Sequence, residues 1–383
     1  MSEWKKVRLG EIANYVNEKI DIKAFDTSLY INTDSMLKDK GGIGTPESIP
    51  ESGKVTKYQH NDILVSNIRP YFKKIWFSNR EGGCSNDVLV FRANDNIDST
   101  FLYYVLSDDS FFDHMMSSAN GTKMPRGNRK LIPSFEIPLP PLSTQHRIAS
   151  ILSRYDSLLE NYQKQIKLLE EAAQRLYKEW FVDLRFPGHE NTVIVDGVPD
   201  GWEKKKLHEI AEVVMGSSPK SEFYNNDKQG LPFHQGVGSY GTRFVDDNVY
   251  STSITRLAEP NSILFSVRAP VGRLNITKNK IIIGRGLAAM NHKDGFQSFL
   301  FYMLKERFFI DNIIGNGSIF ASISKVELLD QEFIVPPMKT IKAFESLASK
   351  LDKKIQGVDT QLRLLAEARD RLLPKLMSGE IEI

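Results

Sequence analysis

Residues 148–180 of this 383-residue chain read IASILSRYDSLLENYQKQIKLLEEAAQRLYKEW. From Ile148 to Trp180, apolar side chains recur at alternating steps of four and three residues without a break. The same pattern runs from Phe344 to Leu376, shifted by 196 positions (344 − 148), and only Arg369 interrupts it. A sustained period of about 3.5 residues predicts a narrow apolar seam on a helix that pairs with a second helix.

We expect the two seams to pair with each other. A helix that packs only on its own globular domain usually has a wider apolar stripe and ends within about 20 residues. Each seam spans 33 residues, which corresponds to about 50 Å at 1.5 Å per residue, so it is longer than such a helix. Because a two-fold axis relates the copies, the pairing predicts an antiparallel coiled coil. The predicted seam residues are Ile148, Leu152, Tyr155, Leu159, Tyr162, Ile166, Leu169, Leu176, Phe344, Leu351, Ile355, Val358, Leu362, Leu365 and Leu372.

The helices belong to a tandem duplication of the whole chain. Five segments of the first half recur in the second half in the same order, with offsets between 196 and 200 positions. Chance matches would not keep this order, and a fixed period indicates a repeat. The matched pairs are Trp4–Ala13 with Trp202–Ala211, Asn61–Pro70 with Asn261–Pro270, Phe101–Leu106 with Phe299–Leu304, Asn120–Thr122 with Asn316–Ser318, and Glu136–Leu142 with Glu332–Met338.

Each half begins with a predicted globular domain of mixed α/β (α+β) structure. Short β-rich segments alternate with Gly, Asn, Asp and Pro, and a helical stretch follows the repeated Phe-Leu motif. We expect Trp4 and Trp202, at matching domain starts, to anchor the cores. The segments predicted as strands include Ser28–Thr33, Asp62–Ser66, Asp87–Arg92, Ile263–Val267 and Lys280–Ile283.

The repeat gives a complete domain plan. Two similar globular domains each precede a long helix, and a segment with Pro and Gly joins the halves, so two heads are expected at opposite ends of a rod. The predicted boundaries are 1–142 for the first recognition domain, 143–183 for the first helix, 184–200 for the linker, 201–337 for the second recognition domain, 338–378 for the second helix and 379–383 for the tail.

Bulk composition narrows the classes of protein. Apolar residues make up 41% and charged residues 26%, as in soluble globular proteins. No run approaches the roughly 18 apolar residues of a membrane span, and Met1–Lys6 does not open a secretory leader. Cys84 is the single cysteine, which excludes an internal disulfide and favours a cytoplasmic location. A net charge of +2 restricts nucleic-acid binding to local basic patches.

The sequence lacks the motifs that catalysis would need. Gly236-Val-Gly238-Ser-Tyr-Gly241 matches the spacing of a dinucleotide-binding loop, but the residues after it do not predict a helix, so we interpret it as a flexible loop. Phosphate-binding loops, metal-ligand spacings, nucleophile elbows and the Asn/Asp-Pro-Pro-aromatic signature of amino-methyltransferases do not occur. We therefore expect a chain without catalytic residues, metal or cofactor.

Basic residues concentrate in the predicted globular domains, whereas acids balance them in 143–183. In 54–74 they lie among Tyr71 and other aromatics, and neither 123–130 nor 268–285 contains an acid. Such loops suit a DNA surface, because cations bind phosphates and Arg and Asn read base edges; a merely solvated surface is the alternative. The candidate DNA-binding residues are Asn67, Arg69, Tyr71, Lys73, Lys74, Lys123, Arg126, Arg129, Arg268, Arg273, Lys278 and Arg285.

These features resemble the specificity subunits of type I restriction–modification systems over nearly the whole chain. One junction departs from the family pattern, since 339–342 read Lys-Thr-Ile-Lys where Gln is usual, and this bears only on the local helix start. The motifs that carry the resemblance are Trp-(x)4-Leu-x-Glu-Ile at 4–12 and 202–210 and Pro-Leu-Pro-Pro-Leu-x-x-Gln-x-x-Ile at 138–148. Two further motifs are Phe-Val-Asp-Leu-Arg-Phe-Pro-Gly at 181–188, which precedes Val-Pro-Asp-Gly-Trp at 198–202, and Leu-Leu-Pro-Lys-Leu-Met-Ser-Gly at 372–379.

The resemblance implies a non-catalytic subunit that reads a split, asymmetric double-stranded DNA target, one part with each recognition domain. It also implies two methyltransferase (modification) subunits and two ATP-driven restriction subunits as partners, with S-adenosylmethionine, ATP and Mg bound by those partners and no membrane involved. Two alternatives from other classes are a fragment of a fused DNA methyltransferase/nuclease and a coiled-coil adaptor scaffold without DNA binding.

Overall fold

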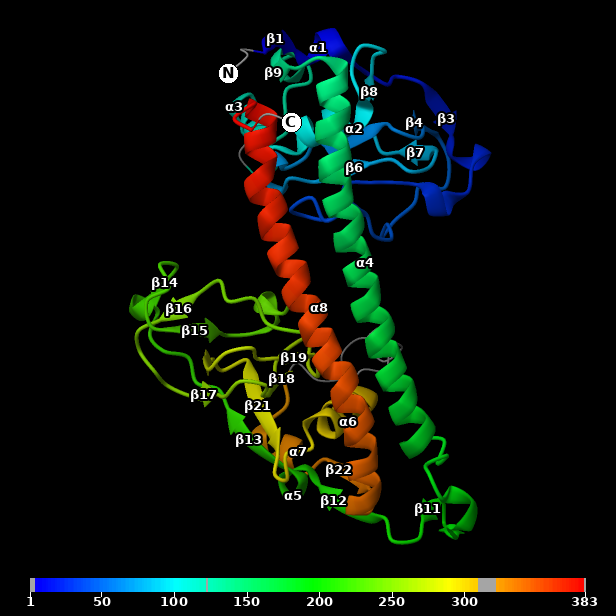
Figure 1. Cartoon of the computed structure of the whole chain (residues 1–383), viewed down its shortest axis with the longest axis vertical. Coiled ribbons are helices and arrows are strands. Elements are labelled where there is room, and N and C mark those ends of the chain that lie inside the picture. Colours follow the sequence, from blue (N-terminus) through cyan, green and yellow to red (C-terminus); the bar gives the residue numbers. More distant parts are fainter. Residues whose placement is uncertain (1–3, 122, 309–321, 382–383) are drawn as a thin grey trace. The chain divides into compact units, whose positions relative to one another are not determined.

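The computed structural model describes residues 4–121, 123–308 and 322–381. These residues form two compact units, one of Met1–Gln163 with Thr360–Ile383 and the other of Lys164–Asp359. The long helices α4 (Leu142–Phe181) and α8 (Met338–Ser378) each contribute to both units (Figure 1). The first unit therefore contains the start of α4 and the end of α8, and the second unit contains the reverse.

The first unit has a four-stranded antiparallel sheet at its centre, in the order β2-β8-β5-β6. A three-stranded sheet β3-β4-β7 and the pair β1-β9 accompany it. The elements are β1 Lys5–Arg8, α1 Leu9–Ile12, β2 Ala13–Tyr15, β3 Lys19–Asp21, β4 Lys54–Tyr58, β5 Ile63–Ser66, β6 Ile75–Phe77, β7 Gly82–Cys84, β8 Val88–Ala93, α2 Ser99–Ser107, α3 Asp109–Ser117 and β9 Glu136–Leu139, with short 3-10 turns at Ile22–Ala24, Thr27–Leu29, Pro70–Phe72 (η3) and Ile132–Ser134.

The second unit repeats this plan with the sheet order β13-β21-β18-β19 and the pair β12-β22. Its additional sheet is larger, with the order β14-β16-β15-β20-β17. The elements are β10 Ile194–Val195, β11 Val198–Pro199, β12 Glu203–Lys206, α5 Leu207–Ile210, β13 Ala211–Met215, β14 Tyr224–Asn225, β15 Leu231–His234, η7 Val237–Ser239, β16 Tyr250–Ser251, β17 Leu257–Ala258, β18 Ile263–Ser266, β19 Leu274–Ile276, β20 Ile281–Ile283, β21 Leu287–His292, α6 Gln297–Phe308, α7 Lys325–Leu329 and β22 Glu332–Val335, with 3-10 turns at His189–Asn191 and Ser221–Phe223.

The mixed α/β class and the duplicated plan are thus confirmed. The repeated Asn of the matched segments has a backbone role, since Asn61 and Asn261 both adopt φ 66° two residues before β5 and β18. Asn tolerates this left-handed conformation better than most residues. Their amides donate to Ser78 and Thr277, each at 2.9 Å, and so start the same pairing in both sheets.

The Pro-Pro motif that precedes each long helix supplies the carbonyl groups that begin it. In the second copy, Thr340 and Ile341 donate to Pro337 at 2.9 and 3.2 Å, as the corresponding amides of α4 do to Pro141. Gln145 is buried and bonds the Asp98 amide and the Pro140 carbonyl. Ile341 takes its place by the offset of 196 and is also buried, so the sequence departure at the second junction does not shift the helix start.

The direction of helix pairing follows from each unit separately. In the first unit, Ile148 and Leu152 of α4 share a core with Leu373 and Leu376 of α8. In the second unit, the end of α4 and the start of α8 share a core through Trp180 and its neighbours with Phe344. The start of each helix therefore packs on the end of the other, which makes the pair antiparallel. Every predicted seam residue is buried or partly buried.

The one polar residue of the second seam, Arg369, has a specific partner. Its Nη1 lies 2.8 Å from Oδ1 of Asp156, and Tyr104 of α2 donates to the other oxygen of that carboxylate at 2.6 Å. A partly buried arginine is stabilised by such a carboxylate because it cannot be deprotonated. The heptad therefore continues through Arg369 without leaving an unpaired charge.

One predicted strand is wrong. Ser28–Thr33 does not form a strand, because Asp26 caps a 3-10 turn through the Ser28 amide and Asn32 accepts from the amides of Asp34 and Ser35. Such local side-chain bonds compete with strand pairing, and only Ile31 makes an isolated bridge, to Cys84. The other four predicted strands coincide with β5, β8, β18 and β20. Thr122 and 316–318, part of the repeated Asn-Gly motif, lie outside the described residues.

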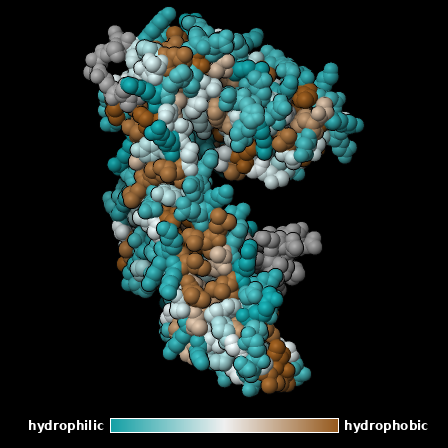
Figure 2. Space-filling model, turned by 45° about the vertical axis from the view of Figure 1, so that its right-hand side comes forward, coloured by the Kyte–Doolittle hydropathy of each residue, from teal (hydrophilic) through white to brown (hydrophobic). Residues whose placement is uncertain are grey.

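Within the described ranges, no helix is long and apolar enough to cross a membrane. The face seen in Figure 2 is mostly hydrophilic, with separate apolar patches. Trp202 is 8% exposed in the core of its unit, and Trp4 packs against the core of the other. Both tryptophans thus serve as the predicted core anchors.

The seam predicts a clear stability difference between two leucines of α4. Leu152 is fully buried, whereas Leu158 is 45% exposed. Leu152→Ala should lower the free energy of unfolding by about 2–5 kcal/mol, because it leaves a cavity in the core. Leu158→Ala should change it by less than about 0.5 kcal/mol. Urea unfolding of both variants measures the difference, and equal losses would contradict the assignment of the seam.

Candidate nucleic-acid interface

The first unit contains a strained loop between β5 and β6, at 67–74. Arg69 and Lys73 have φ of 51° and 49°, on either side of η3. Left-handed backbone is uncommon outside glycine and concentrates at functional sites. The loop is held in place because the Arg69 amide donates to the Pro125 carbonyl at 2.8 Å and Ile68 bridges Arg126. Two of the basic segments found in the sequence therefore lie together.

Two polar atoms of this loop lack partners among the described residues. Asn67 is 7% exposed, and neither its Oδ1 nor Nε of Arg69 makes a hydrogen bond. Buried polar atoms without partners are rare in folded proteins. Together with the left-handed backbone, these two atoms identify 67–74 as a candidate binding loop.

Cations gather around the ring of Phe72. Nζ of Lys38 lies 4.2 Å from the ring centroid, Nζ of Lys74 lies at 5.9 Å and Cζ of Arg69 at 6.0 Å. Tyr71 is 46% exposed and packs edge-on against Phe72. Burial lowers the pKa of Lys74, whose ammonium donates to the Thr33 carbonyl at 2.6 Å. Lys74 therefore stabilises the fold as well as adding charge.

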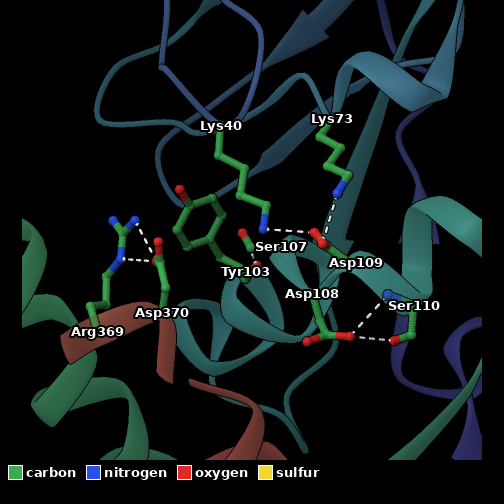
Figure 3. Close-up of polar contacts among 9 residues, drawn as sticks. All are labelled: Lys40, Lys73, Tyr103, Ser107, Asp108, Asp109, Ser110, Arg369 and Asp370. Atoms are coloured by element: carbon green, nitrogen blue, oxygen red, sulfur yellow. Dashed lines mark hydrogen bonds and ion pairs between the residues drawn. The ribbon is translucent and has the colours of Figure 1, made fainter. Parts of the chain in front are cut away.

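Lys40 and Lys73 converge on one carboxylate, that of Asp109 at the start of α3 (Figure 3). Their Nζ atoms lie 3.1 and 2.7 Å from its two oxygens. The hydrogen bond from Lys73, with that from Lys40, holds the pKa of Asp109 below its usual value. The Lys40 amide also donates to the Lys73 carbonyl at 2.9 Å, so the two loops form one surface.

Sequence reasoning missed Lys38 and Lys40. They flank Asp39 and follow another acid, Asp34, so the run does not stand out by charge. Only the tertiary contacts with Phe72 and Asp109 bring them to the basic surface.

The remaining first-unit candidates are exposed. Lys123 is open to solvent, Nη2 of Arg126 lies 3.3 Å from the Asp87 carboxylate, and Nη2 of Arg129 donates to the Asn86 carbonyl at 3.1 Å. An exposed ion pair of this kind contributes at most about 1 kcal/mol. The guanidinium of Arg126 can therefore exchange Asp87 for a phosphate at little cost.

In the second unit, Arg268 and Arg285 line a cleft of about 200 Å³. Both side chains are exposed, and within the described residues neither guanidinium group makes a hydrogen bond or an ion pair. The loops after β15, β18 and β20 meet here, since the Gly284 amide donates to His234 at 2.8 Å and the Val267 amide to Gly286 at 2.9 Å. The loops at these three strand ends therefore form a cleft in which the guanidinium groups of Arg268 and Arg285 are exposed.

The loop that matches the dinucleotide-binding spacing forms one wall of this cleft, through Gly236 and Val237. A 3-10 turn lies within the motif, and the next element after it is the strand β16, not an α-helix, as predicted. His234 pins the loop, because its Nδ1 lies 2.7 Å from Oγ of Ser239 and its Nε2 lies 2.9 Å from Oδ1 of Asp247. These two contacts hold the loop in place, which differs from the flexible loop that the sequence predicts.

Arg273 and Lys278 lie outside the residues that line this cleft. Arg273 is partly buried, and its amide donates to Oγ of Ser266 at 2.8 Å. Nζ of Lys278 lies 2.8 Å from the carboxylate of Asp359 on α8, and its side chain is 16% exposed. The contact favours a structural role for Lys278.

The described residues contain no group of three or more His, Cys, Asp or Glu residues that could hold a metal. Burial raises the pKa of the Cys84 thiol to about 12, which keeps it neutral and unreactive. The surface is a set of loops suited to binding.

Comparison with known proteins supplies the class. The family model of the type I restriction modification DNA specificity domain matches residues 1–171 and 199–361. The type I restriction enzyme MjaIX specificity subunit of Methanocaldococcus jannaschii is 30% identical, over 76% of this chain and 70% of the relative. The HindI specificity subunit of Haemophilus influenzae is 23% identical over the full length of both chains.

The fold agrees with these matches. The crystal structure of a type I restriction–modification S subunit from M. genitalium superposes with a TM-score of 0.59, at 18% identity, over 98% of this chain and 96% of that one. The chain therefore belongs to the family of type I restriction–modification specificity subunits. It serves DNA target recognition and is the non-catalytic component of such an enzyme.

The two loops predict separable effects on DNA recognition. Arg69→Ala should weaken recognition of one part of the target and Arg268→Ala the other. Loss of a base-reading arginine costs about 1–3 kcal/mol and relaxes one position, whereas loss of a phosphate contact weakens all sequences alike and lowers the salt slope by about one. The measurement is binding to duplexes with each position varied, at two salt concentrations. Arg185→Ala, which removes an exposed arginine paired with Glu179, is the control. Unchanged affinity in both loop variants would show that the loops are structural.

Proposed function

We propose that this subunit reads a bipartite, asymmetric target in double-stranded DNA, with one recognition domain on each half-site. The observation that carries the proposal is that the same sheet in both units bears different loops. In the first unit, β5 leads into the strained loop with Arg69, and in the second unit β18 leads into the cleft with Arg268 and Arg285. Equal frameworks with unlike reading surfaces imply two unlike half-sites.

The proposal assigns the spacing of the half-sites to the helices. Helices α4 and α8 contain 40 and 41 residues and pair through the buried seam. A paired helix resists bending more than a flexible linker does. The two half-sites should therefore flank an unread gap of fixed length.

The proposal also includes the partners of the complex. Two modification subunits and two restriction subunits would dock on this chain and supply the chemistry, with S-adenosylmethionine, ATP and Mg bound by them. Buried, reduced Cys84 fits a cytoplasmic location for the assembly. The family match speaks against a fragment of a fused methyltransferase/nuclease and against an adaptor scaffold without DNA.

Methylation mapping tests the two-reader proposal. Cells that carry this subunit with its modification partner should methylate two unlike short motifs separated by a constant gap. A variant in which the first half replaces the second should methylate an inverted repeat of the first motif, because a two-fold axis then relates identical readers. A single continuous motif in the unmodified protein would refute the proposal.

A further inference from the structure

Each unit contains an equivalent hydrogen bond between a tyrosine of its recognition domain and an aspartate of a long helix. Tyr104 donates to Asp156 of α4 at 2.6 Å, and Tyr302 donates to Asp352 of α8 at 2.8 Å. The pairs are related by the repeat, with offsets of 198 (302 − 104) and 196 (352 − 156). Each partly buried carboxylate also has a cation beside it, as a desolvated charge requires.

The source of that cation differs between the units. In the first unit, Asp156 forms an ion pair with Arg369, which belongs to helix α8. The position equivalent to Arg369 in α4 is Ala173 (369 − 196), which is fully buried and carries no charge. The helix pair thus lacks the corresponding arginine at Asp352, and the recognition domain provides one.

Arg243 is that residue, and it is anchored on three sides. Its Nη2 lies 2.7 Å from Oδ1 of Asp352 on α8, and its Nη1 lies 3.5 Å from Oε1 of Glu170 on α4. Its Cζ lies 3.5 Å from the ring centroid of Phe301 on α6, and its side chain is 2% exposed. One residue of the recognition domain therefore contacts both long helices.

Arg243 is linked to the cleft through the chain, since it follows the cleft residue Val237 by six positions (243 − 237). It lies in the turn that follows the Gly236–Gly241 wall, where Tyr240 bridges Val245 and the Gly241 amide donates to Phe244 at 3.1 Å. Lys278 anchors the same turn a second time. Its Nζ lies 5.1 Å from the Phe244 ring centroid and 2.8 Å from the carboxylate of Asp359 on α8.

We propose that Arg243 and Lys278 are positioning residues that fix the reading loops of the second recognition domain relative to the helical spacer, and so select the gap length. The inference rests on the proposed bipartite function. A buried arginine tolerates few alternative geometries, since displacement leaves charges unpaired in a dry site. One base pair moves a half-site by about 3.4 Å and turns it by about 35° around the DNA axis. A rigid anchor therefore discriminates gaps that differ by a single base pair.

The test uses the chain assembled with its modification subunits and duplexes whose gap is correct, one base pair shorter or one base pair longer. Arg243→Met and Lys278→Met remove the charge and keep most of the side-chain volume. Each should reduce the ratio of methylation rates between the correct and altered gaps by about tenfold, which corresponds to about 1.4 kcal/mol of discrimination. The base preferences within both half-sites should remain unchanged, which a general loss of structure would not allow.

Two controls separate this role from others. Arg371→Met removes an exposed arginine paired with Glu367 on α8 and should leave gap discrimination as in the unmodified protein. Arg268→Ala should alter base preference in one half-site and keep the gap. If Arg243→Met fails to assemble, Lys278→Met decides. Assembled variants with unaltered gap discrimination would overturn the inference alone, whereas an unmodified subunit without any gapped preference would refute the proposed function as well.

Discussion

The antiparallel pairing of α4 and α8 is the constraint on which the rest of the structure depends. The seam places the start of each helix in the same core as the end of the other, so neither recognition domain completes its core alone. In the first unit Leu376 joins Ile148, and in the second unit Trp180 joins Phe344. Each core therefore contains residues from both halves of the repeat.

The two units neutralise equivalent, partly buried carboxylates with arginines from different parts of the chain. Both contain a Tyr–Asp pair under the sheet, but Arg369 of the helix pair neutralises one carboxylate and Arg243 of a recognition loop neutralises the other. In the first unit, contacts within the recognition domain hold the loops, such as the ion pairs of Lys40 and Lys73 with Asp109. In the second unit, Arg243 and Lys278 instead form ion pairs with carboxylates of the long helices. Unlike loops on a common framework thus differ in how they are held and not only in what they present.

Regular patterns made the framework predictable from the sequence. The heptad and the repeat gave the helices and their pairing, and the apolar run of β5 recurs in β18 because both strands are wholly buried. Ser28–Thr33 failed because side-chain bonds of Asp26 and Asn32 favour turns there. The local sequence around Arg243 and Lys38 does not indicate their roles. Arg243 pairs with Asp352, which lies far away in the sequence, and Lys38 contacts Phe72, which lies in another loop. The sequence indicated where cations concentrate, but tertiary contacts decide which of them remain open to DNA.

The central claim, that the paired helices set the distance between two reading surfaces, is tested most directly by lengthening both helices together. Seven residues inserted after Leu159 and seven after Ile355 keep the heptad phase and preserve the pairing. The insertion adds about 10 Å, equivalent to up to about three base pairs of duplex. Methylation mapping of this double variant should return both half-sites unchanged, separated by a longer gap, with weaker activity because the added base pairs also rotate one half-site. An active double variant that keeps the original gap would contradict the account.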